Sequence, residues 1–255
     1  MKRPGAAGLI TLTLAVLFGA VLAGAGLADP QAWLKGLTHL GVFASDLFPP
    51  DLESLPILIR AMAETVRIAY AGTVLGFLLS VPLAYLSTRT LFGPAVSGAS
   101  RAVVGALRTV PSILFGVVFV VAFGLGEAAG ILGVALYTVG YLGKIYYEAF
   151  EGVDPEVLEA VRGTGARRLQ IFRYALLPEA SNTVLGQALF MFEYNIRASA
   201  ILGFVGAGGI GYYMLGYVQM LQYRHLMTAL LVTFVVVMIT DRVSRAVRAR
   251  LGAAA

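Results

Sequence analysis

Two charged side chains interrupt an apolar stretch of the sequence, and their types and spacing suit anion chemistry. Glu193 and Arg197 lie four residues apart, so both occupy one face of a helix. Asn195 and Ser199 add hydrogen-bonding groups to the same segment. An ionisable residue in a membrane span faces protein or water, and the planar fork of a guanidinium matches phosphate-like oxygens. Arg197 therefore either lines an anion pathway or forms a structural ion pair with Glu193, and both readings stay open.

A second charged pair lies at the start of an earlier apolar stretch. Glu64 and Arg67 are three residues apart, which allows them to interact on one helix face. We interpret them mainly as an interfacial ion pair near the outer entrance, and we count both among the candidate pathway residues.

A glycine-rich segment satisfies the Gly-x-Gly-x-x-Gly spacing of dinucleotide-binding proteins with Gly206, Gly208, Gly209 and Gly211. That fingerprint requires a preceding strand, a following helix and an acidic residue about 20 positions later. Here an apolar helical pattern precedes the glycines, so we do not predict a dinucleotide-binding site. We predict instead a flexible break between the last two spans, near the outer face, that serves either close helix packing or gating.

The elements that must position these residues are predicted from composition. The chain has 255 residues, of which 58% are hydrophobic and 13% charged, and its mean hydropathy is +0.82. A soluble domain of this length needs far more charged surface. Six apolar stretches are candidate spans: 9–28, 68–87, 109–126, 128–143, the region after Glu179, and 226–240. We expect an all-α, polytopic membrane protein with about six transmembrane helices, and a kink at Pro111 in the third.

The first 28 residues allow two interpretations. Lys2 and Arg3 precede an apolar run, and residues 23–29 resemble a signal-peptide cleavage region. The run is longer than a usual signal core, so a retained first span is favoured. The chain has no cysteine, and its two histidines are far apart in sequence. No nucleophile–base or metal-ligand constellation is present, so we predict neither an enzyme nor a metal site.

The distribution of basic residues predicts orientation. Lys and Arg are concentrated before the first span, in two later loops and in the tail after residue 240, so both termini are expected in the cytosol. The first outer loop, residues 29–60, is expected to form short interfacial turns. The net charge is +5, but the basic residues flank apolar spans, so we predict a lipid bilayer partner and no nucleic acid.

The loop at residues 150–178 reads as a compact helix–turn–helix element on the cytosolic surface. Asp154 followed by Pro155 is a strong helix start. Gly163 and Gly165 are expected to end or bend that helix. A second segment, 167–177, mixes apolar and basic residues, and Pro178 is expected to close it.

The spacing in this loop resembles the permeases of ABC importers. Their pattern is Glu-Ala-Ala, three residues, Gly, nine residues, Ile, one residue, Leu-Pro. Here it is matched by five residues: Glu159, Ala160, Gly165, Leu177 and Pro178. Val161 and Ala175 depart from it, and both are apolar replacements.

This resemblance implies a type I ABC importer permease fold whose loop docks in a cleft of a separate ATPase. Glu159 would supply the acidic contact, Gly165 the sharp turn, and Pro178 the exit into the fifth span. The sequence has no Gly-x-x-x-x-Gly-Lys-Ser/Thr motif. The resemblance therefore implies that the chain binds no cofactor itself and that ATP and Mg²⁺ are bound by an ATPase subunit dimer.

A narrower resemblance, over about residues 60–245, is to the permeases of phosphonate importers. They share a Phe-Glu-x-Asn-x-Arg-Ala stretch, here around Glu193, and a Val-Gly-Ala-Gly-Gly-Ile-Gly turn, here 205–211. Arg108 and Pro111 also match, whereas Ser112 replaces the common Glu.

The narrower resemblance implies a homodimeric permease in a bacterial cytoplasmic membrane, with an extracytoplasmic substrate-binding protein. The cargo would be phosphonate, phosphite or phosphate, moved by ATP-driven alternating access. We expect residues 1–255 to form one permease domain. A permease for another solute (sulfonate, nitrate or amino acid) is the alternative, and a secondary transporter is a more distant one.

Overall fold

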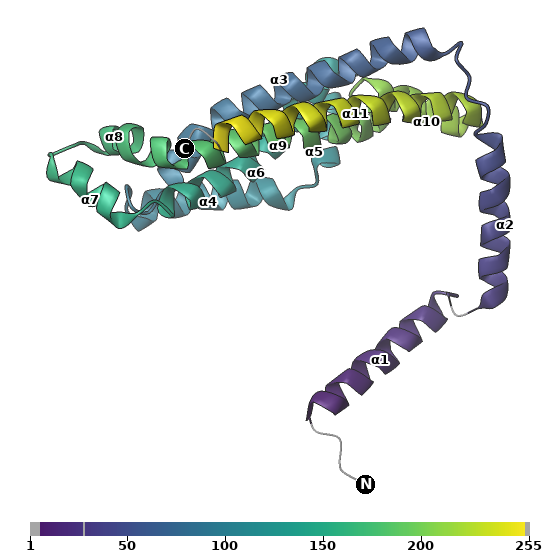
Figure 1. Ribbon diagram of the computed structural model, residues 1–255, viewed down its shortest axis with the longest axis horizontal. Helices are drawn as coiled ribbons and strands as arrows, with labels where there is room; N and C mark the ends of the chain where they lie inside the picture. The colour runs from purple at the N-terminus through teal and green to yellow at the C-terminus, as the bar shows by residue number, and fades with distance from the viewer. Residues whose placement is uncertain (1–5, 28, 253–255) are drawn as a thin grey trace. The chain divides into compact units, whose positions relative to one another are not determined.

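The structure is a computed structural model that describes residues 6–27 and 29–252 (Figure 1). It divides into two compact units, Met1–Pro50 and Asp51–Ala255. Within the described ranges the regular elements are helices, and no strand occurs. The predicted all-α class is therefore confirmed. Lys2, Arg3 and Ala28, which entered the interpretation of the N-terminus, lie outside the described residues.

The first unit consists of two helices, α1 (Ala6–Gly24) and α2 (Pro30–Asp46). α2 begins where the Asp29 carboxylate accepts a hydrogen bond of 2.9 Å from the Gln31 amide, a standard N-cap. The expectation that residues 29–60 form only short turns was wrong. Turns do follow Asp46, but residues 30–46 form a helix, because the Asp29 N-cap and a proline at the first helical position together start one.

Four long helices of the second unit are apolar enough to cross a membrane: α3 (Leu55–Ser87), α6 (Glu127–Glu151), the continuous helix Arg168–Val205, and α11 (Tyr223–Gly252). A bent pair of helices raises the number to five if it is one span. α1 contributes a shorter apolar helix, Ile10–Gly24. These segments overlap the six predicted spans, but among the described residues four of them, or five with the bent pair, are long and apolar enough to cross a membrane.

The third predicted span, 109–126, contains only the second member of a bent pair of helices. α4 (Pro94–Thr109) and α5 (Ser112–Phe123) meet at an angle of 90°. The break falls at Val110 and Pro111, since a residue before proline avoids the helical region, and Val110 is extended. The predicted kink is confirmed, although it is sharper than a bend within one helix. α5 alone has 12 residues, about 18 Å of helix.

Small residues let α3 and α6 pack closely. A Cβ on Gly72 would lie 2.6 Å from the side chain of Val134, and one on Gly76 would lie 2.5 Å from that of Thr138. Both distances are too short for real atoms, so the two helices approach more closely than alanines would allow. Such contacts between small residues drive helix association in lipid, where the hydrophobic effect does not.

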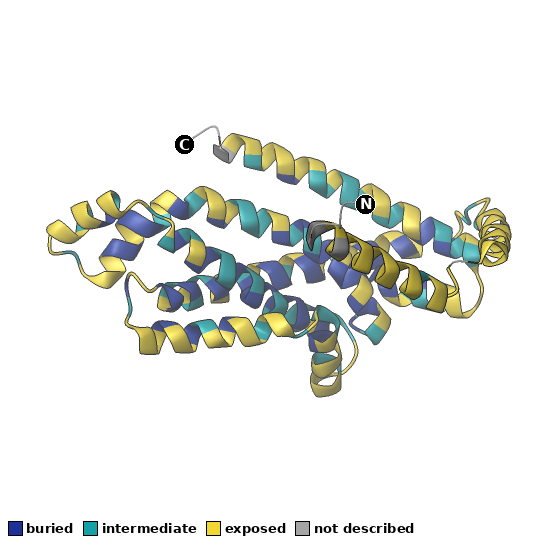
Figure 2. Cartoon of the chain, turned by 90° about the horizontal axis from the view of Figure 1, so that it is seen from below, coloured by how far each residue is buried: buried dark blue, intermediate teal, exposed yellow. Residues whose placement is uncertain are grey.

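The second unit buries its core and presents an apolar exterior. In Figure 2, buried residues gather where its helices face one another, and exposed residues follow the outer faces. Large apolar side chains are among the exposed ones, including Leu78, Val121, Phe234 and Ile239. A water-soluble surface of this kind would aggregate, whereas lipid accommodates it. Burial therefore supports the bilayer predicted from composition.

The helix that contains Pro178 is continuous, which the sequence reading missed. α8 (Arg168–Ile171) leads into a π-helical turn (Phe172–Leu176), and α9 (Leu177–Leu202) follows without a break. The Leu177 amide donates to the carbonyl of Phe172, five residues earlier. Pro178 has no amide to donate, and it is tolerated because the wider π turn has already shifted the hydrogen-bond register.

The remaining elements follow a 3₁₀ turn at Gly203–Val205: α10 (Ile210–Gln219) and then α11. α11 does not end with its apolar segment at residue 240. It continues as one helix to Gly252, so the basic residues 242–250 lie on a helix that packs against α9, not on a free tail.

Candidate functional site

The first candidate site is the helix–turn–helix element between α6 and α9. α7 (Pro155–Gly163) begins as predicted, because the Asp154 carboxylate accepts a 2.9 Å hydrogen bond from the Glu156 amide. It ends before Gly165, whose φ of +77° belongs to the left-handed region that glycine adopts most easily. The predicted roles of both residues in local structure are confirmed.

The exposed face of this element is hollowed. Glu159, Ala160 and Gly165 are all exposed. This face contains a depression of 520 Å³ that is lined by Ala160, Gly165, Gln170 and Tyr174 among others. Ligand-binding clefts usually measure about 300–1,000 Å³. The carboxylate of Glu159 and this concave surface are therefore free to receive a partner.

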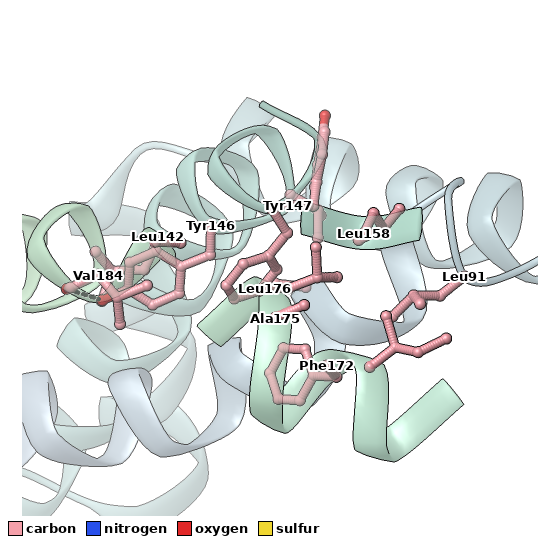
Figure 3. Close-up of a cluster of buried hydrophobic side chains, with 14 of the residues drawn as sticks. Leu91, Leu142, Tyr146, Tyr147, Leu158, Phe172, Ala175, Leu176 and Val184 are labelled. Carbon is pink, nitrogen blue, oxygen red and sulfur yellow. Dashed lines mark hydrogen bonds between the residues drawn. The ribbon is translucent and has the colours of Figure 1, made fainter. Parts of the chain in front are cut away.

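The opposite face of the element is packed into the core. Figure 3 shows Leu158 of α7 and Phe172, Ala175 and Leu176 of the π turn in one cluster with residues of α6. Tyr146 of α6 is fully buried, and its hydroxyl donates a 2.8 Å hydrogen bond to the carbonyl of Val184 in α9. The inner face of α7 is therefore close-packed in the same cluster as residues of α6 and α9.

Polar contacts join the same end of the unit to the α3–α4 connection. The Arg162 guanidinium of α7 donates to the carbonyl of Thr90. At the end of α6, Glu151 pairs with Arg101 of α4 and accepts a 2.6 Å hydrogen bond from the Arg89 amide. The 150–178 loop is thus anchored to two neighbouring segments, the α3–α4 connection and α4.

The second candidate site is the Gly-rich turn, residues 203–211, at the end of the second unit opposite α7 (Figure 1). Gly206, Gly208 and Gly209 have φ values of +88°, +85° and +77°. A Cβ on Gly211 would lie 1.7 Å from the carbonyl oxygen of Ala200. Backbone angle and space therefore both require glycine here, and the prediction of a break between spans is confirmed.

Side chains of α3 hold this turn in place. The Glu64 carboxylate accepts a 3.0 Å hydrogen bond from the Gly209 amide, and the Thr65 hydroxyl accepts one of 2.8 Å from the Ile210 amide. The Gly126 amide also donates to the carbonyl of Gly206, at 2.9 Å. The break is therefore hydrogen-bonded on two sides, which corrects the expectation of a merely flexible segment.

Glu64 and Arg67 do not form the interfacial pair expected from their spacing. Arg67 instead forms an ion pair with Glu127, the first residue of α6. The sequence did not identify Glu127 as the partner of Arg67, because the two residues are 60 positions apart. The only indication that Glu127 matters was its position between two apolar stretches. Glu64, Arg67 and Glu127 together connect α3, α6 and the Gly-rich turn at one end of the second unit.

Contacts with Asp51, the first residue of the second unit, hold the start of α11 in place. His225 lies 2.6 Å from the Asp51 carboxylate, and the Thr228 hydroxyl donates to the Asp51 carbonyl at 2.7 Å. Burial, with the nearby Tyr213 and Asp51, raises the pKa of Tyr217. The contacts with Asp51 fix the start of α11 beside that of α3.

Asn195 forms hydrogen bonds with side chains of two other helices. Its side chain is fully buried, and its amide donates to Thr73 of α3 at 2.8 Å and to Thr138 of α6 at 2.9 Å. Ser199 is also buried, and neither its hydroxyl nor the Asn195 carbonyl oxygen has a hydrogen-bond partner among the described residues. Asn195 therefore joins three helices, a role that its place among the predicted pathway residues did not anticipate.

The third candidate site is the charged group on α9. Arg197 and Glu193 form the pair that their spacing allowed, with 3.2 Å between the guanidinium nitrogen and the carboxylate oxygen. The Arg197 side chain is 47% exposed and that of Glu193 10%. The second carboxylate oxygen lies 4.0 Å from Arg248 of α11. Arg248 was expected in the cytosolic tail after residue 240, because sequence alone does not show that α11 continues beside α9.

The fold and these sites define a class of protein. Several long apolar helices, an apolar exterior and a charged pair within an apolar helix are features of a multi-pass membrane protein.

Comparison with known families places the chain within that class. Residues 72–252 match the family described as binding-protein-dependent transport system inner membrane component. That match covers more than half of the sequence, and the chain belongs to this family. The predicted membership of the ABC importer permeases is thereby confirmed.

Individual relatives support the same family. The chain is 36% identical to the phosphite transport system permease protein PtxC of Stutzerimonas stutzeri, over 92% of this chain and 87% of that protein. It is 36% identical to the phosphate-import permease protein PhnE of Mycolicibacterium smegmatis, over 83% of this chain and 40% of that protein.

Among solved structures, an inward-facing MetNI methionine ABC transporter superposes with a TM-score of 0.71. The sequence identity is 22%, and the alignment covers 79% of this chain and 99% of that one. At this identity the likeness concerns the fold, and it confirms the predicted type I ABC importer permease fold.

Proposed function

We propose that this chain is the permease subunit of an importer for a phosphorus oxyanion (phosphite, phosphonate or phosphate), driven by a separate ATPase. The observation that carries the cargo assignment is the sequence similarity, over most of both chains, to a phosphite transport permease. The exposed guanidinium of Arg197 supports it, since a planar cation at membrane depth suits a tetrahedral oxyanion.

The exposed α7 surface is the proposed docking site for the ATPase. Glu159 contributes the acidic contact, and Gly165 and Leu177-Pro178 shape the element that enters the partner's cleft. The buried cluster beneath α7 supports this assignment, because it mechanically links the docking face to α6 and α9. ATP and Mg²⁺ belong to the partner, whose closure would move these helices as rigid bodies.

This assignment sets the topology. The α7 end faces the cytosol together with both termini, and the Gly-rich turn faces the extracytoplasmic binding protein. Two permease copies would enclose the pathway, with Arg197, Glu193 and Ser199 along it. Glu64, Arg67 and the glycines Gly206, Gly208, Gly209 and Gly211 would form the outer gate. This gate would open when the hydrogen bonds between α3 and the Gly-rich turn break.

Transport by the purified complex tests the proposal. The permease would be reconstituted in proteoliposomes with its ATPase and binding protein, and uptake of phosphite, phosphate and methylphosphonate would be compared with uptake of sulfonate and amino acids. ATP-dependent uptake of a phosphorus oxyanion is the expected result. Uptake of only the other solutes would refute the cargo, and uptake without an ATPase would refute the importer class.

A further inference from the structure

A polar cavity lies between the first half of α9 and the end of α11. Its volume is 370 Å³, and Asn182, Thr183 and Gln187 of α9, Tyr141 of α6 and Arg248 of α11 line it. Phe190 completes the wall and stacks with Tyr141, with 6.3 Å between ring centroids. The volume lies in the lower range of small-molecule sites, which hold about 300–1,000 Å³.

We propose that this cavity is an inner binding site for a phosphorus oxyanion, with Arg248 as its cationic residue. The lining offers donors of the required kinds: a guanidinium fork, two side-chain amides and two hydroxyls. An arginine among amide and hydroxyl donors is an arrangement that suits a tetrahedral oxyanion, whose oxygens accept several hydrogen bonds at once.

The charges around the cavity favour an anion. Among the described residues, the charge contact of Arg248 is with Glu193, at a distance of 4.0 Å, the limit of an ion pair. Glu193 lies closer to Arg197, at 3.2 Å. Two guanidinium groups therefore share one carboxylate, which leaves one net positive charge. In a partly buried environment such a charge is costly unless an anion balances it.

The order of these groups along α9 gives the site its place in transport. Asn182 is four residues beyond Pro178 and Arg197 nineteen, so along the helix axis they lie about 6 Å and about 28 Å from that proline. Glu193 lies between the cavity and Arg197 and contacts both arginines. An oxyanion that leaves Arg197 toward the α7 end therefore meets Arg248 next and competes with Glu193 for it.

The inference rests on the proposed function for the direction of transport and for the identity of the cargo. The chemistry of the ligand, a phosphate-like group, could also come from the headgroup of an anionic lipid, so the experiment separates the two sources.

The test is ligand-dependent thermal stability of the nucleotide-free permease–ATPase complex in nanodiscs. Phosphate and phosphite are added to phosphatidylcholine discs, with potassium chloride at equal ionic strength as the blank. A ligand that binds the folded complex raises its Tm. We expect a shift for the wild type, and binding at least about tenfold weaker for Arg248→Gln.

Two further variants make the result specific. Gln187→Leu removes an amide from the cavity without altering charge and should also weaken binding. Arg245→Gln is the matched control, because this neighbouring arginine is 61% exposed and pairs with Asp241; it should bind as the wild type does. If Arg248→Gln does not yield a stable complex, the comparison of Gln187→Leu with Arg245→Gln decides the question.

Several outcomes overturn the inference. An undiminished Tm shift in Arg248→Gln and Gln187→Leu would place the anion elsewhere. Stabilisation only in phosphatidylglycerol discs, with no effect of free anions, would assign the cavity to lipid. Uptake of a phosphorus oxyanion by a complex that shows no Tm shift would refute this site and leave the proposed function intact. A Tm shift without any uptake would support this site and refute the proposed function.

Discussion

Substitution of Gly165 by alanine isolates the backbone requirement of the loop proposed to contact the ATPase. Gly165 has a φ of +77°, and nothing lies within 4 Å of the Cβ that alanine would add. The substitution therefore introduces no clash, and its effect comes from backbone strain alone. An L-residue in the left-handed region costs about 1–2 kcal/mol, which lowers the population of the native turn by about 5- to 30-fold relative to competing conformations.

The expected result is loss of coupling with retention of fold. Since the turn is exposed and distant from the transmembrane core, Gly165→Ala should insert and assemble normally. The assay is the ratio of ATP hydrolysed to solute imported in proteoliposomes that contain the complete complex. We expect this ratio to rise several-fold, because the ATPase cycles against a loop that less often presents its docking shape.

Two variants provide controls. Gly163→Ala also adds a Cβ in open space, but at the helical end of α7 with an ordinary φ, where alanine is favoured by about 0.5–1 kcal/mol. It should couple as well as the wild type. Gly165→Asn should recover part of the coupling, since asparagine tolerates the left-handed region. If Gly165→Ala couples normally, or if both alanine variants fail alike, the argument from backbone angle is refuted.

Three other substitutions test the remaining sites. Gly211→Ala places a Cβ 1.7 Å from the Ala200 carbonyl oxygen, so it should lower the Tm of the complex, with a penalty of about 1–3 kcal/mol or more. Gly216→Ala is the control, because nothing lies within 4 Å of its added Cβ, and it should leave the Tm unchanged. Equal Tm values for the two variants would contradict the close approach at Gly211. Glu159→Lys should abolish stimulation of the ATPase by the permease while membrane insertion, followed by protease accessibility, is unchanged; normal uptake would disprove the docking role. Arg197→Ala should abolish oxyanion uptake, and persistent uptake with unchanged apparent affinity would show that this guanidinium is structural.

Much of the fold could be predicted from local patterns. Long uncharged stretches fixed where spans occur, because backbone groups in lipid must bond within helices. The Asp154-Pro155 start of α7 and the special conformation at Gly165 depend on neighbouring residues only, and both agree with the structure. The same local reasoning found the Glu193–Arg197 pair, since residues four apart on a helix are neighbours wherever the helix lies.

Local reasoning failed where a distant segment supplied a better partner. Glu64 and Arg67 have the spacing of a pair, but Arg67 binds Glu127 and Glu64 binds the Gly209 amide. Pro178 has the properties of a helix terminator, but the π turn before it keeps the helix continuous. In each case a tertiary contact or a change of register outweighed a preference of a few kcal/mol or less.

The amino-acid sequence by itself determined the helical class, the approximate spans, the helix–turn–helix element and the family to which the chain belongs. These follow from hydropathy, local backbone preferences and residue spacing, which need no knowledge of the folded chain. Only the tertiary structure decided that Asn195 is a buried link between α3, α6 and α9, and that Arg248 lies beside Glu193 on a continued α11. Those contacts join residues tens of positions apart, and their geometry depends on how whole helices pack, which no local pattern specifies.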